Sequence, residues 1–252
     1  MKISVITATW NSGKTIRDTI ESVRSQTHGD VEHVIQDGGS QDNTLEICQE
    51  YEDLSVVSGS DRGIYDAMNK GIRRATGDII GILNSDDFYT DNDVLARVAE
   101  EFGKDPELEA VYGDIHFVSP KNLHKCTRYY SSAYFRPWLL RFGFMPAHPS
   151  FYVRREVYEK YGLYDLQFRT SSDFEWMVRL FAKEHIRAKY IRKDFVTMRA
   201  GGESTAGMEA KRKVNNDIVA SLKKHGIFTC GAFRYVRYAW KAVELCWTKI
   251  RH

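Results

Sequence analysis

The first hundred residues alternate between strand-like and helix-like patterns, and this alternation limits the possible folds more than any other feature. Apolar strand patterns occupy residues 3–8, 31–36, 54–59 and 78–83, and helical spacing occupies 12–26, 42–51 and 63–75. Such alternation predicts a mostly parallel, Rossmann-like sheet with right-handed crossovers. A chain of 252 residues can bury one substantial core. We therefore expect one main α/β unit.

In the second half of the chain, strand and helix patterns alternate less regularly. A helix is expected over 94–104, a strand pair over 108–118 and 124–131, and a short strand and helix at the end of the aromatic, basic segment 133–162. Another helix, 171–184, begins with a Ser171 or Ser172 cap and has an apolar stripe that faces inward, formed by Phe174, Met177, Val178 and Phe181. A polar helix then runs to about residue 225.

Composition excludes several classes of protein. The 36 Lys and Arg nearly balance the 34 Asp and Glu, so no overall charge favours nucleic acid as a partner. The four cysteines lie far apart without a CxxC pair, which argues against a zinc ribbon or a disulfide scaffold and fits a reducing compartment. The start lacks a signal-peptide cleavage pattern, and no apolar stretch reaches the ~18 residues that span a bilayer. We expect a cytoplasmic protein.

Polar residues follow each of the first four predicted strands, within the stretches TATWN, IQDGGS, SGSDRG and LNSDD. Ligands of parallel sheets bind at the carboxyl ends of the strands, so these residues should gather at one edge. The candidates for binding a nucleotide ligand there are Thr7, Thr9, Asn11, Asp37, Ser60, Asp61, Arg62, Asp86 and Asp87.

Asp86 and Asp87 place two adjacent carboxylates at the end of an apolar strand. They repel each other near a low-dielectric core unless a cation lies beside them. Mg²⁺ or Mn²⁺ held there would neutralise the diphosphate leaving group of a nucleotide sugar. The alternative is a turn or helix-cap role, but Asn92 and Asp93 already supply a cap for the next helix.

Two other strand ends have competing interpretations. Asp37 before Gly38 and Gly39 could accept a hydrogen bond from a base or ribose, or simply form a turn. A methyltransferase or dinucleotide site is a further alternative, although the GxGxxG-like loop that such sites place after the first strand is missing here. Asp61 and Arg62 end the third strand, where Arg62 could contact a phosphate or the ribose.

Taken in order, ISVITATWN, VIQDGGSQDNT, SDRGIYDAMNKGI, ATGDIIGILNSDD and HPSFYVRREVYEKYGLYD…SSDFEWMVRL resemble the family 2 glycosyltransferases with the GT-A fold, over about residues 1–200. The likeness is greatest to members that build bacterial surface polysaccharides such as exopolysaccharide, capsule or O-antigen. It implies an inverting, metal-dependent hexosyl transfer from a nucleotide sugar to a saccharide or a polyprenyl-diphosphate-linked acceptor.

The resemblance also implies roles for single residues. Asp37 matches the base-binding Asp, and Asp86 with Asp87 matches the DxD-type element for metal and ribose, with Asp87 preferred as the metal ligand. Here Asn84 and Ser85 precede the pair, in place of the family's first Asp. That departure leaves open how the two Asp divide the roles.

Asp173 matches the position of the family's catalytic base, with Ser172 where Glu is usual. A carboxylate suits this task because an acceptor hydroxyl needs a base to take its proton. Glu175 is the nearby rival, and the alternative for Asp173 is an ordinary acid at a helix N-terminus. His148 is expected on the acceptor side, or as a structural histidine.

The end of the chain raises the question of membrane contact. The loop 201–207 has the glycines of a lid or of a simple loop. We expect a transferase domain over 1–225, with a nucleotide-sugar half (1–100) and an acceptor half (101–225), and a C-terminal amphipathic helix over 226–252. Its apolar stripe is Phe233, Val236, Trp240, Val243, Trp247 and Ile250, flanked by Arg234, Arg237, Lys241, Lys249 and Arg251.

That helix predicts either peripheral contact with the cytoplasmic face of the inner membrane or packing on the domain. A non-catalytic, membrane-associated assembly partner that keeps the same fold is a further alternative for the whole protein.

Overall fold

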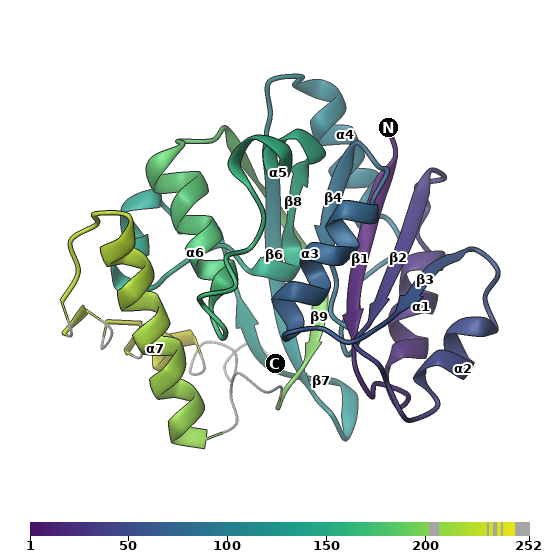
Figure 1. The fold of residues 1–252 in the computed structure, drawn as a ribbon. Helices are drawn as coiled ribbons and strands as arrows, with labels where there is room; N and C mark the ends of the chain where they lie inside the picture. Colours follow the sequence, from purple (N-terminus) through teal and green to yellow (C-terminus); the bar gives the residue numbers. More distant parts are fainter. Residues whose placement is uncertain (202–206, 231, 234–235, 238, 245–252) are drawn as a thin grey trace.

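The computed structural model describes residues 1–201, 207–230, 232–233, 236–237 and 239–244. Within them, nine strands form one sheet in the order β3-β2-β1-β4-β8-β6-β9-β5, with β7 paired to β6 (Figure 1). The strands are β1 (Ile3–Thr9), β2 (Val31–Asp37), β3 (Leu54–Ser58), β4 (Ile79–Ile82), β5 (Phe88–Tyr89), β6 (Ala110–Ser119), β7 (Asn122–Tyr130), β8 (Phe151–Arg154) and β9 (Ala188–Arg199).

Strands β3, β2, β1 and β4 are parallel, as the alternation of patterns predicts. Their register puts the strand ends side by side, with Thr9 opposite Asp37 and Asp37 opposite Ser58. The loops that follow these strands therefore begin at the same edge of the sheet. This is the edge at which parallel sheets bind ligands.

The rest of the sheet mixes directions. β8 is antiparallel to both β4 and β6, and β6 is parallel to β9, so the carboxyl end of β9 returns to the edge where β1 and β4 end. The sequence did not predict β9. Its pairing with β6 shifts register between Tyr112 and Asp114 and again before Ile115, and such irregularities disturb the two-residue period of a strand.

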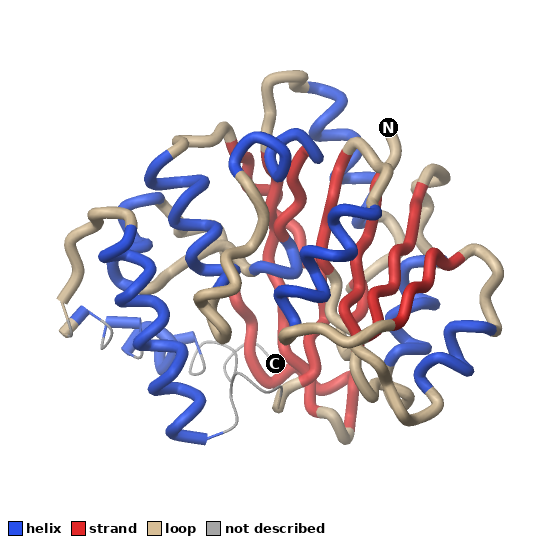
Figure 2. Tube along the Cα trace, in the orientation of Figure 1, coloured by secondary structure: helices blue, strands red, loops and turns tan. Residues whose placement is uncertain are grey.

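Helices cover both faces of the sheet (Figure 2). They are α1 (Ile16–Arg24), α2 (Thr44–Gln49), α3 (Ile64–Arg74), α4 (Val94–Lys104), α5 (Arg155–Tyr161), α6 (Ser172–Val178) and α7 (Gly207–Lys224). Apolar residues of α3, α5 and α6 share one buried cluster with Ile6 of β1, whereas those of α4 share another with Val5. Successive residues of a strand point to opposite faces, so β1 contributes to both cores.

The segment 171–184, predicted as one helix, consists of an α-helix followed by a π-helix. α6 continues into a π-helix, Arg179–Lys183, in which the backbone nitrogen of Glu184 bonds the carbonyl of Arg179. The four residues of the expected apolar stripe are all buried. Ser171 occupies the N-cap position without a side-chain cap bond, and the Ser172 hydroxyl instead donates to the carbonyl of Asp165 at 2.8 Å.

Two predictions near the C-terminus reach beyond the described residues. The predicted lid falls mostly on 202–206, and Arg234, Trp247, Lys249, Ile250 and Arg251 also lie outside the described part of the chain. Residues 239–244 are helical. Within the described ranges, no helix combines the length and apolar character that crossing a bilayer requires.

Candidate active site

Hydrogen bonds join the loops that follow the parallel strands. The Ser12 hydroxyl after β1 lies 2.8 Å from that of Ser85 after β4, and the Gly38 nitrogen after β2 donates to the Thr9 carbonyl at 2.9 Å. A Cβ atom on Gly38 would lie only 2.5 Å from Oδ2 of Asp61, so glycine there lets the loop after β3 approach. The strand-end edge is thus one connected surface.

Asp86 and Asp87, here called the acidic pair, lie in the loop that leaves β4. Asp87 is fully buried, its Oδ2 accepts a bond from the Asn84 side chain at 2.9 Å, and its Oδ1 is buried without a hydrogen-bond partner. Asp86 is half-buried. A buried carboxylate oxygen without a partner needs an explanation, and a role as a cation ligand would provide one.

The electrostatics of the acidic pair favour a bound cation. Burial raises the pKa of Asp86, and burial together with the charge of Asp86 raises the pKa of Asp87 well above its usual value. The part of the chain that the structure describes contains no cluster of three or more His, Cys, Asp or Glu suited to a metal. Mg²⁺ needs only one or two protein carboxylates when substrate phosphates supply other ligands, so the pair still fits.

Arg199, at the carboxyl end of β9, holds the loop of the acidic pair. Its guanidinium donates to the Asp86 carbonyl and to the Asp18 carboxylate of α1, and it lies 5.1 Å from the centre of the Phe88 ring. The positive charge of Arg199 also opposes the rise in the pKa values of Asp86 and Asp87. Arg199 thereby joins three elements of the sheet edge.

Asp37 is fully buried and binds its own loop. Its Oδ2 accepts bonds from the nitrogens of Gly39 and Ser40, each at 3.0 Å, and from the Ser58 hydroxyl at 2.6 Å. Its Oδ1 accepts one bond, from the Ser40 hydroxyl at 2.5 Å. Because a carboxylate oxygen has two lone pairs, Oδ1 can accept one further hydrogen bond.

The structure separates the remaining candidates of the nucleotide side. The Thr7 hydroxyl points into the core, 3.0 Å from Nε2 of His33, so Thr7 does not face the edge. The Thr9 hydroxyl is buried without a partner. Asn11 is exposed, and its side-chain oxygen accepts a bond from Gln41. Arg62 is exposed and pairs with Asp66 at 3.6 Å.

Asp173 lies in the first turn of α6 and contacts α3. Its Oδ1 accepts a bond from the Tyr65 hydroxyl at 2.8 Å and another from the Phe174 nitrogen at 2.8 Å. Tyr65 lies three residues after Arg62, so this bond ties Asp173 to the helix that follows a loop of the strand-end edge. Asp173 is half-buried, which leaves its carboxylate within reach of solvent.

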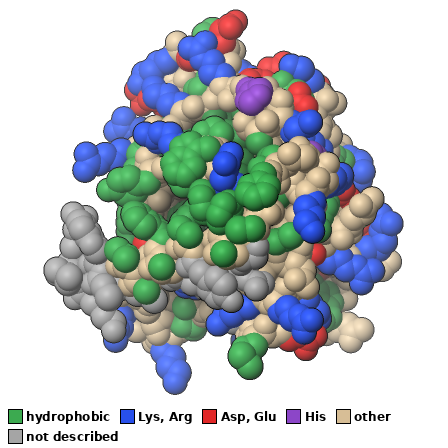
Figure 3. Space-filling view, turned by 90° about the vertical axis from the view of Figure 1, so that its left-hand side faces the viewer, with side chains coloured by type: hydrophobic (Ala, Val, Ile, Leu, Met, Phe, Trp, Pro, Cys, Tyr) green, Lys and Arg blue, Asp and Glu red, His purple; other side chains and the backbone are tan. Residues whose placement is uncertain are grey.

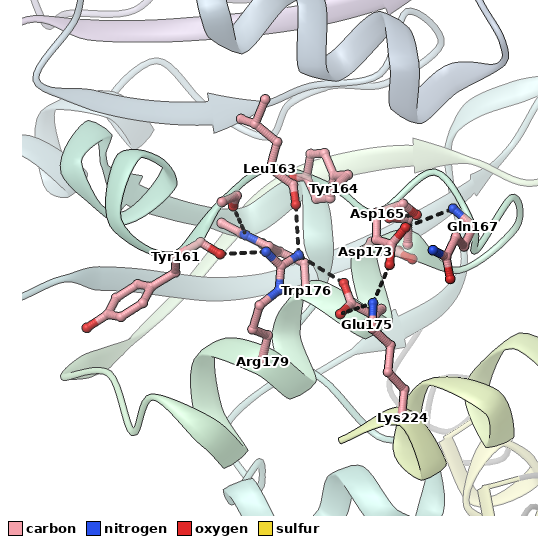
Figure 4. Close-up of polar contacts among 12 residues, drawn as sticks. Tyr161, Leu163, Tyr164, Asp165, Gln167, Asp173, Glu175, Trp176, Arg179 and Lys224 are labelled. Atoms are coloured by element: carbon pink, nitrogen blue, oxygen red, sulfur yellow. Dashed lines mark hydrogen bonds and ion pairs between the residues drawn. The ribbon is translucent and has the colours of Figure 1, made fainter. Parts of the chain in front are cut away.

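Glu175, the rival of Asp173, is engaged in a buried ionic network (Figure 4). Only 1% exposed, it accepts a bond from Arg179 at 2.9 Å, and its other oxygen lies 2.6 Å from Nε2 of His225. Lys224 approaches the same carboxylate at 3.8 Å and also pairs with Asp165. Glu175 therefore connects α6 with the end of α7, and Asp173 is the more accessible of the two carboxylates.

His148 is buried beside Asp173 and not open to the surface. Its Nε2 lies 2.7 Å from the Tyr164 hydroxyl, and burial lowers its pKa while the charge of Asp173 opposes that shift. The Asn69 side chain of α3 holds the backbone of Tyr164 through two bonds, at 2.9 and 3.0 Å. His148 thus belongs to the buried packing around Tyr164.

Sequence reasoning missed Tyr65, Tyr164 and Arg199. Tyr65 begins a helix right after a candidate loop, which is a usable positional signal, but the helical pattern of its segment concealed it. Arg199 ends a strand that was not predicted. A surface hollow of about 480 Å³ lies at the opposite edge of the sheet, lined by Glu109, Glu156 and Lys160 among others, and it contains none of the predicted site residues.

Comparison with known proteins shows which family the sequence matches. Residues 4–162 match the family described as glycosyl transferase family 2. A "PGL/p-HBAD biosynthesis glycosyltransferase" of Mycobacterium tuberculosis is 32% identical over 193 residues, which cover 75% of this chain and 73% of that protein. An uncharacterized glycosyltransferase of the same species is 33% identical over 182 residues, or 70% of this chain and 68% of that one.

Solved structures share the fold at low sequence identity. TarS 1-349 of S. aureus in complex with UDP superimposes with a TM-score of 0.64 at 18% identity, over 88% of this chain and 65% of that one. The mannosyltransferase PcManGT of Pyrobaculum calidifontis, in complex with GDP-Man and Mn²⁺, gives 0.59 at 17% identity over 98% and 83%. This chain spans just under two thirds of the length of the TarS fragment.

Proposed function

The chain belongs to glycosyl transferase family 2, and from this premise we propose that it moves a sugar from a nucleotide-sugar donor to an acceptor hydroxyl with inversion. We propose a saccharide or a lipid-linked saccharide as the acceptor, in the synthesis of a bacterial surface polysaccharide. Complexes of neighbours with UDP, UDP-GlcNAc and GDP-Man support the donor class. The methyltransferase alternative has no support in these comparisons.

The partnerless Oδ1 of Asp87, beside a second carboxylate at the strand-end edge, is the observation that carries the proposal. Asp86 and Asp87 would hold Mg²⁺ or Mn²⁺, which when bound supplies Lewis-acid neutralisation of a diphosphate. Asp87, the preference from sequence, would bind the ion through this Oδ1, and the partly accessible Asp86 would supply a second carboxylate beside it. The Mn²⁺ in the PcManGT complex supports a divalent metal.

Side chains of the protein would bind the donor and deprotonate the acceptor. The free acceptor position on Asp37 would bind the base or ribose of the donor, with Asp61 and Arg62 on the adjacent loop. Asp173 would take the proton of the acceptor hydroxyl while the hydroxyl oxygen attacks the anomeric carbon of the donor sugar. The attack would come from the side opposite the nucleoside diphosphate, which departs as the leaving group. Tyr65 orients the Asp173 carboxylate through their 2.8 Å bond.

Ligand-induced stabilisation tests the proposal directly. UDP-, GDP- and dTDP-sugars are screened for a rise in melting temperature with and without Mg²⁺ or Mn²⁺, because a ligand that binds only the folded state stabilises it. We expect one nucleotide class to stabilise the protein in a metal-dependent manner, and Asp86→Asn to abolish the metal dependence. No stabilisation by any nucleotide sugar would contradict the proposal.

The alternative of a non-catalytic assembly partner requires a test in cells. If the protein acts only by binding, cells carrying Asp173→Asn produce the same amount of polymer as cells with the native chain. We expect them to lose the polymer, because the variant keeps the fold and lacks the base.

A further inference from the structure

Exposed aromatic side chains from three separate segments gather on one face of the molecule. Tyr134 is 70% exposed, Trp138 58%, Phe228 71% and Trp240 41%. Figure 3, which looks onto the side where α7 and the C-terminal segment lie in Figure 1, shows hydrophobic side chains concentrated there with Lys and Arg around them. We call these four residues, together with Val236 and Val243, the aromatic face.

Ring contacts join the side chains of the aromatic face into two groups. Tyr134 meets Trp240 edge-on at 6.0 Å, and Trp138 meets Phe142 at 6.0 Å. Phe142 packs on Phe233 of the C-terminal segment at 4.5 Å. Exposed hydrophobic residues scattered singly are normal, but a contiguous group of this kind marks an interaction surface.

Two described polar side chains of the C-terminal segment bind the domain. Arg237 bonds Asn215 of α7 at 2.9 Å, and Glu244 accepts a bond from Arg128 of β7. Val236, Trp240 and Val243, spaced four and three residues apart, share another side of the helical segment and are 47%, 41% and 45% exposed. One side of this helical segment therefore contacts the domain, as one of the two interpretations from sequence predicts, and the side with Val236, Trp240 and Val243 is partly exposed.

Positive charge accompanies the aromatic face. Arg136 and Arg141, in the segment that carries Tyr134 and Trp138, are exposed. Burial and the neighbouring charges of Arg128, Lys211 and Arg237 lower the pKa of Lys241, next to Trp240. Glu244 is the acidic group that opposes this shift. A surface with this excess of cations favours an anionic partner.

We propose that the aromatic face docks on the surface of an anionic phospholipid bilayer, with Trp138, Trp240 and Tyr134 in the interface and Arg136, Arg141 and Lys241 at the headgroups. Trp and Tyr suit this boundary because their rings are apolar and their N–H and O–H groups stay hydrated. Basic residues beside them add attraction to anionic lipids. The inference goes beyond the proposed transfer reaction, since docking requires no turnover.

Vesicle co-sedimentation of the full chain tests the proposal. The protein should bind vesicles of phosphatidylcholine mixed with phosphatidylglycerol, and bind less to phosphatidylcholine alone. Trp138→Ser with Trp240→Ser should lower the partition coefficient by about tenfold or more, since each exposed ring loses its burial in the interface. Val57→Ser, which removes a 45% exposed side chain from the edge strand β3, should have no effect.

A charge-matched pair of variants tests the lipid selectivity. Arg136→Gln with Lys241→Gln should remove the preference for phosphatidylglycerol, whereas Arg73→Gln with Lys121→Gln, both exposed elsewhere, should keep it. Circular dichroism and melting temperature check that each variant is folded. Asp173→Asn should bind vesicles like the native chain, which separates failure of docking from failure of the proposed function.

Two results would overturn the inference. One is equal, negligible sedimentation of the native chain with both kinds of vesicle. The other is a dimer in analytical ultracentrifugation that the two Trp substitutions convert to a monomer without any change in vesicle binding, because a second copy of the chain would then cover the face.

Discussion

The hydroxyl of Tyr65 donates a hydrogen bond of 2.8 Å to Oδ1 of Asp173, 108 positions later in the sequence. The bond joins the start of α3, which follows the nucleotide-side loop, to the start of α6. The Tyr65 ring also lies 5.6 Å from the ring of Tyr164, whose backbone Asn69 holds. The orientation of the proposed base therefore depends on residues of the donor half.

Tyr65→Phe removes this bond and keeps the ring. Hydrogen bonds to charged groups contribute roughly 1.5–3 kcal/mol, so we expect kcat to fall about 10- to 100-fold if the bond matters to the reacting state. KM for the donor should change little, because Tyr65 does not contact the nucleotide side of the proposed site. Steady-state kinetics measure kcat and this KM, with the donor that the melting-temperature screen identifies.

Tyr130→Phe provides the matched control for a lost tyrosine hydroxyl. Its hydroxyl donates to the Met145 carbonyl at 2.6 Å, away from Asp173. An equal loss of kcat in both variants would mean that Tyr65 acts only through stability.

Asp173→Asn should separate catalysis from folding. General-base catalysis contributes roughly 10²- to 10⁴-fold, and we expect kcat to fall by that amount. The melting temperature should stay close to that of the native protein, because Asp173 is half-buried and its contact with the Phe174 nitrogen can persist in the amide. Retained turnover would reject Asp173 as the base.

Glu175→Gln should show the reverse pattern. Breaking a buried ion pair by neutralising one partner costs roughly 3–5 kcal/mol, and here Arg179 would keep its charge without the matching carboxylate. The free energy of unfolding, measured in urea, should fall by about that amount. Activity per folded molecule should survive, and its loss in a stable variant would instead favour Glu175 as the base.

The parallel half of the fold was predictable because each strand and each helix carries its own period. Ile16, Ile20 and Val23 repeat at helical spacing on α1, and all three are buried. β9 escaped prediction because its partner determines its conformation. Near its end, Phe195, Val196 and Thr197 are buried in succession, so this part of the strand does not alternate between buried and exposed positions.

Site residues at strand ends were predictable from topology, but their orientation was not. Thr7 lies two residues before the end of β1, and its hydroxyl bonds His33 in the core. Tyr65 and Arg199 act through contacts with residues more than a hundred positions away, Asp173 and Asp86 respectively. Such contacts are properties of the tertiary structure, and a local pattern does not contain them.

The acidic pair predicts how stability depends on pH without metal. Unfolded Asp titrates near ~3.9, and the pKa values of Asp86 and Asp87 are raised in the folded protein, so the folded state holds these protons more tightly. Their contribution to stability is complete below the unfolded pKa and is lost as the pH rises through the folded values. We expect the melting temperature in a chelator to decrease over that range.

Two comparisons isolate the contribution of the pair. Asp86→Asn with Asp87→Asn should flatten this part of the pH profile, because the groups that bind the extra protons are gone. Mg²⁺ with the nucleoside diphosphate should raise the melting temperature of the native protein at neutral pH and leave that of the double variant unchanged. An unchanged slope in the double variant would assign the pH dependence to other groups.

Close packing of α3 on the sheet predicts a steric effect at Gly71. A Cβ atom there would lie 2.4 Å from Cγ2 of Ile6, so Gly71→Ala should lower the free energy of unfolding by about 1–3 kcal/mol. Gly103 in α4 has nothing within 4 Å of the same position, and Gly103→Ala should raise it by roughly 0.5–1 kcal/mol. Urea denaturation measures the free energy of unfolding of each variant, and the prediction requires a decrease for Gly71→Ala and an increase for Gly103→Ala. Because α3 carries Tyr65 in its first turn, a shifted α3 should also lower kcat in Gly71→Ala.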